Sequence, residues 1–211
     1  MTAIAIFPIP NCVAFPGTVF PLHVFEPRYR QLVRYCLETE TPLAVCHVTK
    51  LVRPGPEGQT RDEALNSNQA TYKPVSIASA GRCELTEELE DGRMLVNVHV
   101  DRRYRLTSER QSLPFMVYEG EYFEDRELNP DESAQALQLR EKVLQRLLAI
   151  THDEPAAQEL LGSSDWQDKP PTEFAFELFG LLQMNGDIMQ RILEMESPID
   201  RMQQALDLLN R

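Results

Sequence analysis

The sequence lacks the motifs that mark the commonest nucleotide-dependent and metal-dependent enzymes. No glycine-rich loop ends in Gly-Lys-Ser or Gly-Lys-Thr, which excludes a phosphate-binding loop of the P-loop type. Its 4 histidines and 4 cysteines show neither Cys-x-x-Cys nor His-x-x-x-His spacing, so the sequence predicts no zinc site. We therefore expect no catalytic activity, no cofactor and no metal.

Long apolar runs and a targeting signal are also missing. No uninterrupted apolar stretch reaches membrane-spanning length, and the first residues, MTAIAIFPIP, lack the basic start of a signal peptide. We expect a cytoplasmic protein that does not associate with membranes. Thiols stay reduced in the cytoplasm, so the cysteines are predicted to be unpaired and structural. They are Cys12, Cys36, Cys46 and Cys83.

Lysine and arginine are outnumbered by aspartate and glutamate, and the imbalance lies almost entirely in the second half of the chain. The formal net charge is −12, of which residues 1–120 contribute −1 and residues 121–211 contribute −11. A negative chain repels phosphate backbones, which argues against non-specific nucleic-acid binding. One dense basic-aromatic run, Arg102-Arg103-Tyr104-Arg105, keeps an RNA-binding module open as the alternative function.

Prolines are concentrated near the start of the chain. Residues 6–32 read IFPIPNCVAFPGTVFPLHVFEPRYRQL, in which 5 prolines interrupt apolar residues. Because proline cannot donate to a sheet ladder, strands here should be short, bent or at an edge. Pro27 is predicted to open a helix, since its fixed φ suits the first helical position. The apolar stripe of this helix comprises Tyr29, Leu32, Val33, Cys36 and Leu37.

The remainder of the first half predicts β-structure. Residues 43–48 and 115–123 read as apolar or aromatic strands, and the polar stretch 53–71 reads as a long loop. Asp91-Gly92 is typical of a two-residue hairpin turn. Gly81, between two strand-like segments, predicts a bulge or a bend.

The second half predicts helices. Asn129 and Glu132 flank Pro130 in the pattern of a capped helix start, and Ser197-Pro198 opens a further helix. Asn185-Gly186 is interpreted as a helix end. Strands followed by helices indicate an α+β chain, with a β-rich lobe at residues 1–127 and a helical bundle at residues 128–211.

Three stretches carry a resemblance to a known family. They are FPLHVFEPRYRQL at residues 20–32, Gly81-Arg82-Cys83 followed by EDGRMLVNVHVDRRYRL at residues 90–106, and LLQMNGDIMQRILEMESPIDRMQQALDLL at residues 181–209. Together they resemble the N-terminal, substrate-binding domain of the ATP-dependent Lon proteases, and more closely the free-standing bacterial proteins built from that domain alone. The sequence departs from the family at Val100, where a glycine is typical, and in the polar insert at 53–71.

The resemblance implies both a fold and a function. The front lobe would be a small PUA-like barrel, related to RNA-binding pseudouridine-synthase modules, and the back lobe a helical bundle. The protein would be a noncatalytic module that binds exposed apolar or unfolded segments of client polypeptides, with a separate protease as a candidate partner. The ATPase and the serine-lysine peptidase of full-length relatives are not expected, because none of the lysines lies in a motif of that peptidase. These lysines are Lys50, Lys73, Lys142 and Lys169.

Candidate binding residues lie in the front lobe. We predict that the binding surface contains Phe20, His23, Glu26, Arg28 and Arg103. Phe20 and His23 lie among prolines that leave backbone groups unpaired, and Glu26 and Arg28 stand at the start of the predicted helix. Two other interpretations stay open: the residues only brace the helix onto the barrel, or a pocket that the sequence does not reveal serves a small-molecule enzyme.

Overall fold

The protein is an α+β chain, as the sequence predicts. The computed structural model describes residues 1–56, 58–60, 63, 67–182 and 184–210. The strands are β1 (Thr2–Pro8), β2 (Val19–Val24), β3 (Leu43–Cys46), β4 (Val48–Arg53), β5 (Thr71–Pro74), β6 (Ile77–Glu88), β7 (Met94–Gln111) and β8 (Met116–Tyr122). The helices are α1 (Pro27–Thr39), α3 (Pro130–Ile150), α4 (Pro155–Gly162), α5 (Ser164–Gln167), α6 (Pro171–Leu181), α7 (Gly186–Leu193) and α8 (Pro198–Leu209).

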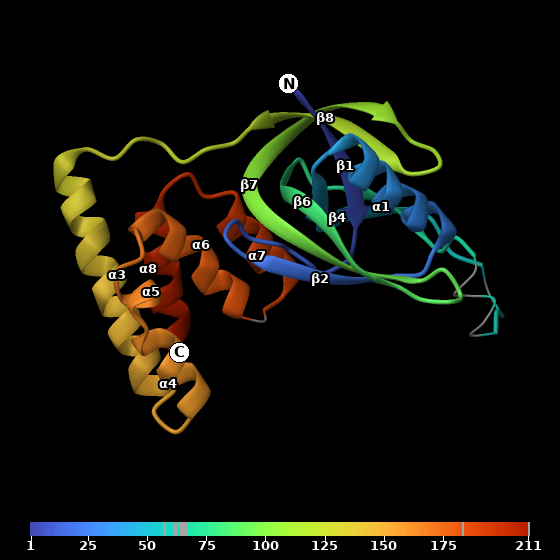
Figure 1. The fold of residues 1–211 in the computed structure, drawn as a ribbon. Coiled ribbons are helices and arrows are strands. Elements are labelled where there is room, and N and C mark those ends of the chain that lie inside the picture. Colours follow the sequence, from blue (N-terminus) through green and yellow to red (C-terminus); the bar gives the residue numbers. More distant parts are fainter. Residues whose placement is uncertain (57, 61–62, 64–66, 183, 211) are drawn as a thin grey trace. The chain divides into compact units, whose positions relative to one another are not determined.

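Five strands close into a small barrel, and β2 extends it on one side (Figure 1). The strand order is β2-β7-β6-β3-β1-β8, and an additional pairing of β7 with β8 closes the ring. β7 has 18 residues, so its first half pairs with β2 and its second half with β8. Consequently β2 has β7 as its strand neighbour on one side, and its other edge carries no strand in the described part of the chain. The predicted position of a proline-containing strand at an edge is confirmed.

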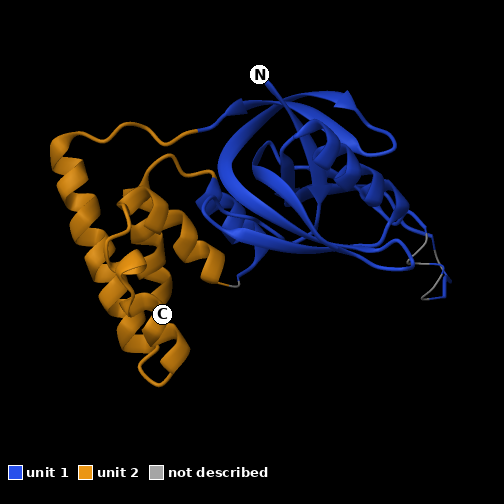
Figure 2. Ribbon diagram, in the orientation of Figure 1, with its two compact units in different colours: residues 1–123, 184–193 blue, residues 124–183, 194–211 orange. Residues whose placement is uncertain are grey.

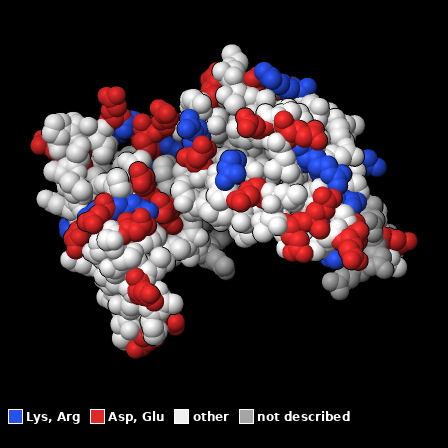
Figure 3. All heavy atoms as spheres, in the orientation of Figure 1, with Lys and Arg blue, Asp and Glu red and all other residues white. Residues whose placement is uncertain are grey.

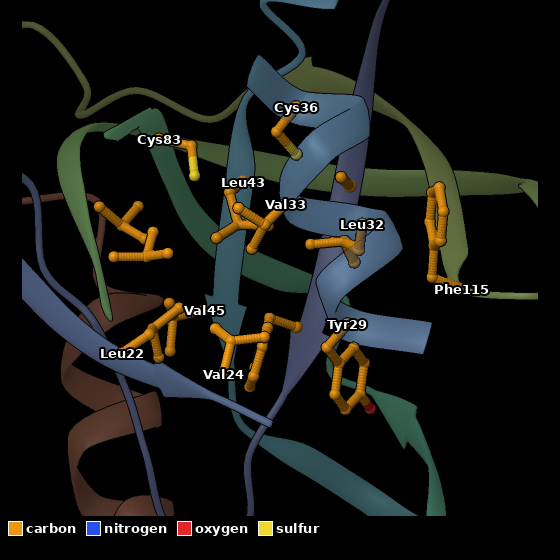
Figure 4. Close-up of a cluster of buried hydrophobic side chains, with 14 of the residues drawn as sticks. Leu22, Val24, Tyr29, Leu32, Val33, Cys36, Leu43, Val45, Cys83 and Phe115 are labelled. Carbon is orange, nitrogen blue, oxygen red and sulfur yellow. The ribbon is translucent and has the colours of Figure 1, made fainter. Parts of the chain in front are cut away.

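Helix α1 packs its apolar stripe onto the barrel core. It begins at Pro27, as predicted, and of the predicted stripe only Leu37 is notably exposed, at 38%. Figure 4 shows the stripe directed toward strand side chains of the same cluster. The labelled residues of that core are Leu22, Val24, Tyr29, Leu32, Val33, Cys36, Leu43, Val45, Cys83 and Phe115.

The capping signals of the second half are confirmed, with one exception. The Asn129 side chain accepts a hydrogen bond from the Glu132 N–H (2.9 Å), and the Glu132 carboxylate accepts one from the Asn129 N–H (3.0 Å). The Ser197 hydroxyl oxygen accepts from a backbone N–H in the first turn of α8. The exception is Gly186, which begins α7 instead of ending α6. A glycine is needed there because a Cβ would lie 2.7 Å from the Cα of Asn11.

The chain forms two compact units (Figure 2). Unit 1 comprises residues 1–123 and 184–193, and unit 2 comprises residues 124–183 and 194–211. The predicted boundary after residue 127 assigns α7 to the helical lobe, whereas its contacts assign α7 to the barrel unit. The Gln190 side chain donates to the Ile77 carbonyl (2.9 Å), and the Leu193 carbonyl accepts from Arg103 (2.6 Å). The division into two separately folding domains stays a prediction.

The polar stretch 53–71 falls partly on residues that lie outside the described ones. Its described ends belong to β4, which runs to Arg53, and β5, which begins at Thr71. These two strands pair with each other in a separate two-stranded sheet. The insert therefore leaves and re-enters the fold at neighbouring points.

Gly81 marks the bulge that the sequence predicts. The register between β6 and β7 shifts between Ala80 and Gly81, and a Cβ on Gly81 would lie 1.8 Å from the carbonyl oxygen of His99. We expect Gly81→Ala to lower the free energy of unfolding by about 2 kcal/mol, because the backbone has to move to admit the methyl group. Urea denaturation measures the change. Gly162→Ala is the control, since nothing lies within 4 Å of a Cβ there, and equal effects of the two substitutions would contradict the prediction.

Candidate functional site

An apolar pocket of about 460 Å³ lies in unit 1 beside the outer edge of β2. Its walls are the end of β1 with the residues that follow, four consecutive residues of β2, the start of α1, and the chain that enters β5. By number they are residues 7–10, 20–23, 25, 26, 29, 69, 70 and 72. We call this cavity the β2 pocket.

The position of the β2 pocket relative to the strand follows from its lining. Successive side chains of a strand point to opposite faces, yet residues 20, 21, 22 and 23 all contribute to the wall. A cavity that touches both faces of one strand lies along the edge of that strand. β7 occupies the opposite edge, so the β2 pocket lies along the edge without a strand neighbour.

An aromatic stack forms one wall of the pocket. The rings of Phe7 and Tyr29 are stacked with centroids 4.3 Å apart. Burial raises the pKa of the Tyr29 hydroxyl well above its usual value, so the phenol is neutral at physiological pH. The wall is therefore uncharged and apolar.

The charges at the pocket rim neutralise each other. Arg28 and Glu26 form an ion pair of 2.8 Å whose side chains are only 10% and 11% exposed. The Arg28 guanidinium also donates to the Thr71 hydroxyl (3.0 Å) and the Ala70 carbonyl (2.7 Å), and Glu26 accepts from the Gln69 N–H (2.9 Å). The pair thus fastens the chain that enters β5 to the start of α1. This geometry agrees with a bracing role, although between α1 and the end of the insert and not between α1 and the barrel.

A second cavity of about 540 Å³ adjoins the first. Tyr29 and Gln69 line both cavities, and Arg28 lines the second. Its far wall consists of residues 112–116, in the connection between β7 and β8 and the start of β8. Tyr29 therefore contributes to the walls of both cavities of unit 1.

The structure brings together three of the five predicted site residues. Phe20, His23 and Glu26 line the β2 pocket. Arg28 lies beside it, in the ion pair with Glu26 and in the wall of the second cavity. Arg103 lies elsewhere: it is 3% exposed, donates to the Leu193 carbonyl and stacks over Phe123 at 4.6 Å. A role of these residues in binding stays a prediction.

Several pocket residues were not predicted. Phe7 and Ile9 come from β1 and its end, Phe25 from the connection to α1, and Tyr72 from β5. The Pro8-x-Pro10 pattern at the end of β1 is a local signal for a bent, incompletely paired chain. Tyr72 has no such signal, because it enters the wall only through the pairing of β4 with β5.

The basic-aromatic run on β7 does not form one exposed strip. Arg103 is buried, while Arg102 stacks over Tyr122 at 4.9 Å and Arg105 over Phe123 at 4.8 Å. On the face shown in Figure 3, basic side chains are interspersed with acidic ones. The arrangement gives no specific support to the RNA-binding alternative.

Three of the four cysteines are buried, and His47 is hydrogen-bonded beside the start of α7. All four cysteines are free thiols, and burial raises the pKa of Cys46 to about 12 and of Cys83 to about 11. His47 accepts from the Asn11 N–H (3.1 Å) and contacts Asp187 (3.1 Å), which fastens the start of α7. Among the described residues no group of three His, Cys, Asp or Glu could hold a metal ion. The same residues include no helix long and apolar enough to cross a membrane.

Comparisons with known proteins identify the family. The family model for the ATP-dependent protease La (LON) substrate-binding domain matches residues 3–211. The crystal structure of a Lon N-terminal domain protein from Xanthomonas campestris is 25% identical, covers 98% of each chain and superposes with a TM-score of 0.61. The N-terminal domain of the Mycobacterium avium complex Lon protease shares the fold, with 14% identity, coverage of 99% of this chain and 98% of that one, and a TM-score of 0.69. The chain therefore belongs to the family of the LON substrate-binding domain.

Proposed function

We propose that the protein is a noncatalytic module that captures exposed apolar segments of other polypeptides in the β2 pocket. The observation that carries this proposal is an aromatic-walled cavity along a strand edge, whose one lining carboxylate, Glu26, is paired with Arg28, in a member of a substrate-binding family. Unfolded chains expose the apolar side chains that such a cavity would desolvate. A separate protease is the partner to which captured chains would be passed.

The proposal explains why both ionisable groups at the rim are paired. A buried carboxylate or guanidinium without its counterpart would oppose the entry of an apolar side chain, because its desolvation is costly. The ion pair between Glu26 and Arg28 removes that obstacle and keeps the wall at residues 69–71 in place. Selectivity would then rest on shape and apolar contact, which suits a protein with many clients.

Phe20→Ala is expected to weaken binding of an apolar peptide by roughly tenfold. The aromatic ring lines the β2 pocket, and loss of its contact with a bound side chain is worth about 1.5 kcal/mol. Fluorescence anisotropy with a labelled ten-residue leucine-rich peptide measures the affinity, which we expect in the range of tens of micromolar. A polar peptide of equal length, with serine at each leucine position, reports non-specific binding.

Leu137→Ala is the matched control for this experiment. Leu137 is also an apolar residue of partial exposure, at 50%, but it lies on α3 in unit 2 and is not among the residues that line the β2 pocket. Its replacement should leave the affinity unchanged. Equal binding of the apolar and polar peptides by the unaltered protein would refute the proposed function, and equal loss in both variants would remove the assignment to the β2 pocket. Thermal melts establish that both variants are folded.

A further inference from the structure

We infer that β2 takes up the captured polypeptide as an added strand, with alternate side chains of that strand entering the β2 pocket. The inference rests on the proposed function and specifies the form of the ligand: an extended segment with apolar residues at every second position. It starts from the edge position of β2. The outer edge of β2 has no strand neighbour in the described part of the chain, and the pocket runs beside that edge.

The register with β7 tells which backbone groups of β2 face outward. The Val100 N–H donates to the Thr18 carbonyl (2.9 Å), just before the first residue of β2. In the same register Phe20 lies opposite Val98, Leu22 opposite Val96 and Val24 opposite Met94. In an antiparallel ladder alternate residues direct both backbone groups to the partner strand and the residues between direct them away. Phe20, Leu22 and Val24 therefore bond to β7.

The outward-facing residues are Val19, Pro21 and His23. Val19 and His23 each present an N–H and a carbonyl group to the edge that has no strand neighbour among the described residues, whereas Pro21 presents only a carbonyl group. An extended polypeptide is the ligand whose own N–H and carbonyl groups repeat at the spacing of these positions. The backbone of the captured segment would thus be recognised whatever its sequence.

Of the usual protections against such pairing, the edge carries a proline, Pro21, but no charged side chain. Natural edge strands are commonly blunted by charged side chains, above all lysine. The residues whose side chains are exposed on β2 are Val19, Pro21 and His23, and none is a lysine, arginine, aspartate or glutamate. The cavity beside them supplies the apolar volume into which side chains of one face of an added strand can insert.

Pro21 favours a foreign segment over a second copy of the same strand. A symmetric antiparallel pair of two β2 strands centred on Pro21 would place proline opposite proline, and neither could donate the central hydrogen bonds. A client segment with an ordinary residue opposite Pro21 donates its own N–H to the Pro21 carbonyl. The proposed occupant is a segment of another polypeptide, and a second copy is left to the test.

An N-methyl scan of a peptide ligand tests the inference on the unaltered protein. The probe is a labelled ten-residue peptide in which leucine alternates with serine, and each variant carries one N-methylated amide. Because the leucines fix which face enters the pocket, we expect methylation of alternate amides to weaken binding about tenfold and methylation of the amides between to change it less than about twofold. A uniform response, or none, would overturn strand addition and leave the proposed function standing.

A backbone change in the protein provides a second, independent readout. His23→Pro removes the outward N–H, whereas His23→Ala removes the side chain but keeps the N–H. We expect His23→Pro to bind the leucine-serine peptide about tenfold more weakly than His23→Ala, and equal affinities would count against the inference. Peptide-reversible self-association of the protein in sedimentation would assign the edge to a second copy and overturn it. If the unmodified peptide does not bind at all, both the proposed function and the inference fail.

Discussion

Arg201→Ala, a change in unit 2, is expected to lower the free energy of unfolding of the protein by about 3–5 kcal/mol, the usual cost of breaking a buried ion pair from one side. Arg201 is fully buried, donates through both terminal nitrogens to the Asp125 carboxylate, and donates to the Met195 carbonyl (2.8 Å). Its guanidinium also lies 3.8 Å from the centroid of the Phe176 ring. Replacement by alanine removes the charge that neutralises Asp125, which is only 11% exposed, and opens a cavity beside Phe176.

The matched control is Arg126→Ala in the same unit. Arg126 also pairs with a carboxylate, that of Glu132 at 2.7 Å, but the two side chains are 47% and 27% exposed. Water screens such a pair, so its loss should cost no more than about 1 kcal/mol. Urea denaturation followed by circular dichroism measures both variants. Destabilisation of similar size in the two would show that burial does not set the strength of the Arg201 contacts.

A fragment that ends at residue 127 is expected to be several kcal/mol less stable than the intact chain, because it lacks α7. That helix belongs to unit 1, and it buries Met189, Ile192 and Leu193, which are 6%, 1% and 1% exposed. Burial of one such side chain contributes about 1.5–3 kcal/mol, which is a large share of the 5–15 kcal/mol by which a typical domain is stable. Buried Arg103 would also lose the Leu193 carbonyl as its acceptor.

A fusion separates the effect of α7 from that of the other helices. Residues 1–123 joined through a long glycine-serine linker to residues 184–193 restore the complete unit 1 without unit 2. We expect the fusion to melt at a higher temperature than the fragment 1–127. If the fragment and the intact chain melt at the same temperature, α7 does not support the barrel. If the fusion gains nothing over the fragment, the support comes from elsewhere in the chain.

Local features of the fold could be predicted because their causes are local. The helix start at Pro27, the capping box at Asn129 and the bulge at Gly81 each depend on the conformational limits of a few neighbouring residues. The edge position of β2 could also be predicted, since Pro21 cannot serve as a donor in a central strand.

The placement of α7 could not be predicted for a different physical reason. Its apolar stripe shows that it packs against something, but a stripe does not identify the surface that it covers. Only the tertiary structure shows that Gln190 reaches the Ile77 carbonyl and that Gly186 lies against Asn11. The same limit applies to Arg103. Its charge predicts an exposed side chain, but the structure shows that it is buried between the Leu193 carbonyl and the Phe123 ring.

The candidate site was predictable where its residues are neighbours in sequence. Phe20, His23 and Glu26 lie along β2 and the connection to α1, so a single unusual stretch predicted all three. The opposite wall comes from the end of β1 and from Tyr72, which are brought near by strand pairing over long separations. A sequence motif can therefore predict one wall of this cavity, whereas the other wall depends on which strands pair in the fold.

The discontinuity of unit 1 bears on how the protein is made. A ribosome that has synthesised residues 1–123 has not yet produced the last segment of the barrel unit, because residues 124–183 come first. At about 5–20 residues per second this interval lasts roughly 3–12 s. During this interval His47 lacks its contact with Asp187, and the surface that α7 covers in the complete protein is not yet covered by that helix. A protein that is proposed to bind exposed apolar segments of other chains thus exposes an apolar surface of its own during synthesis, and chaperones could bind that surface.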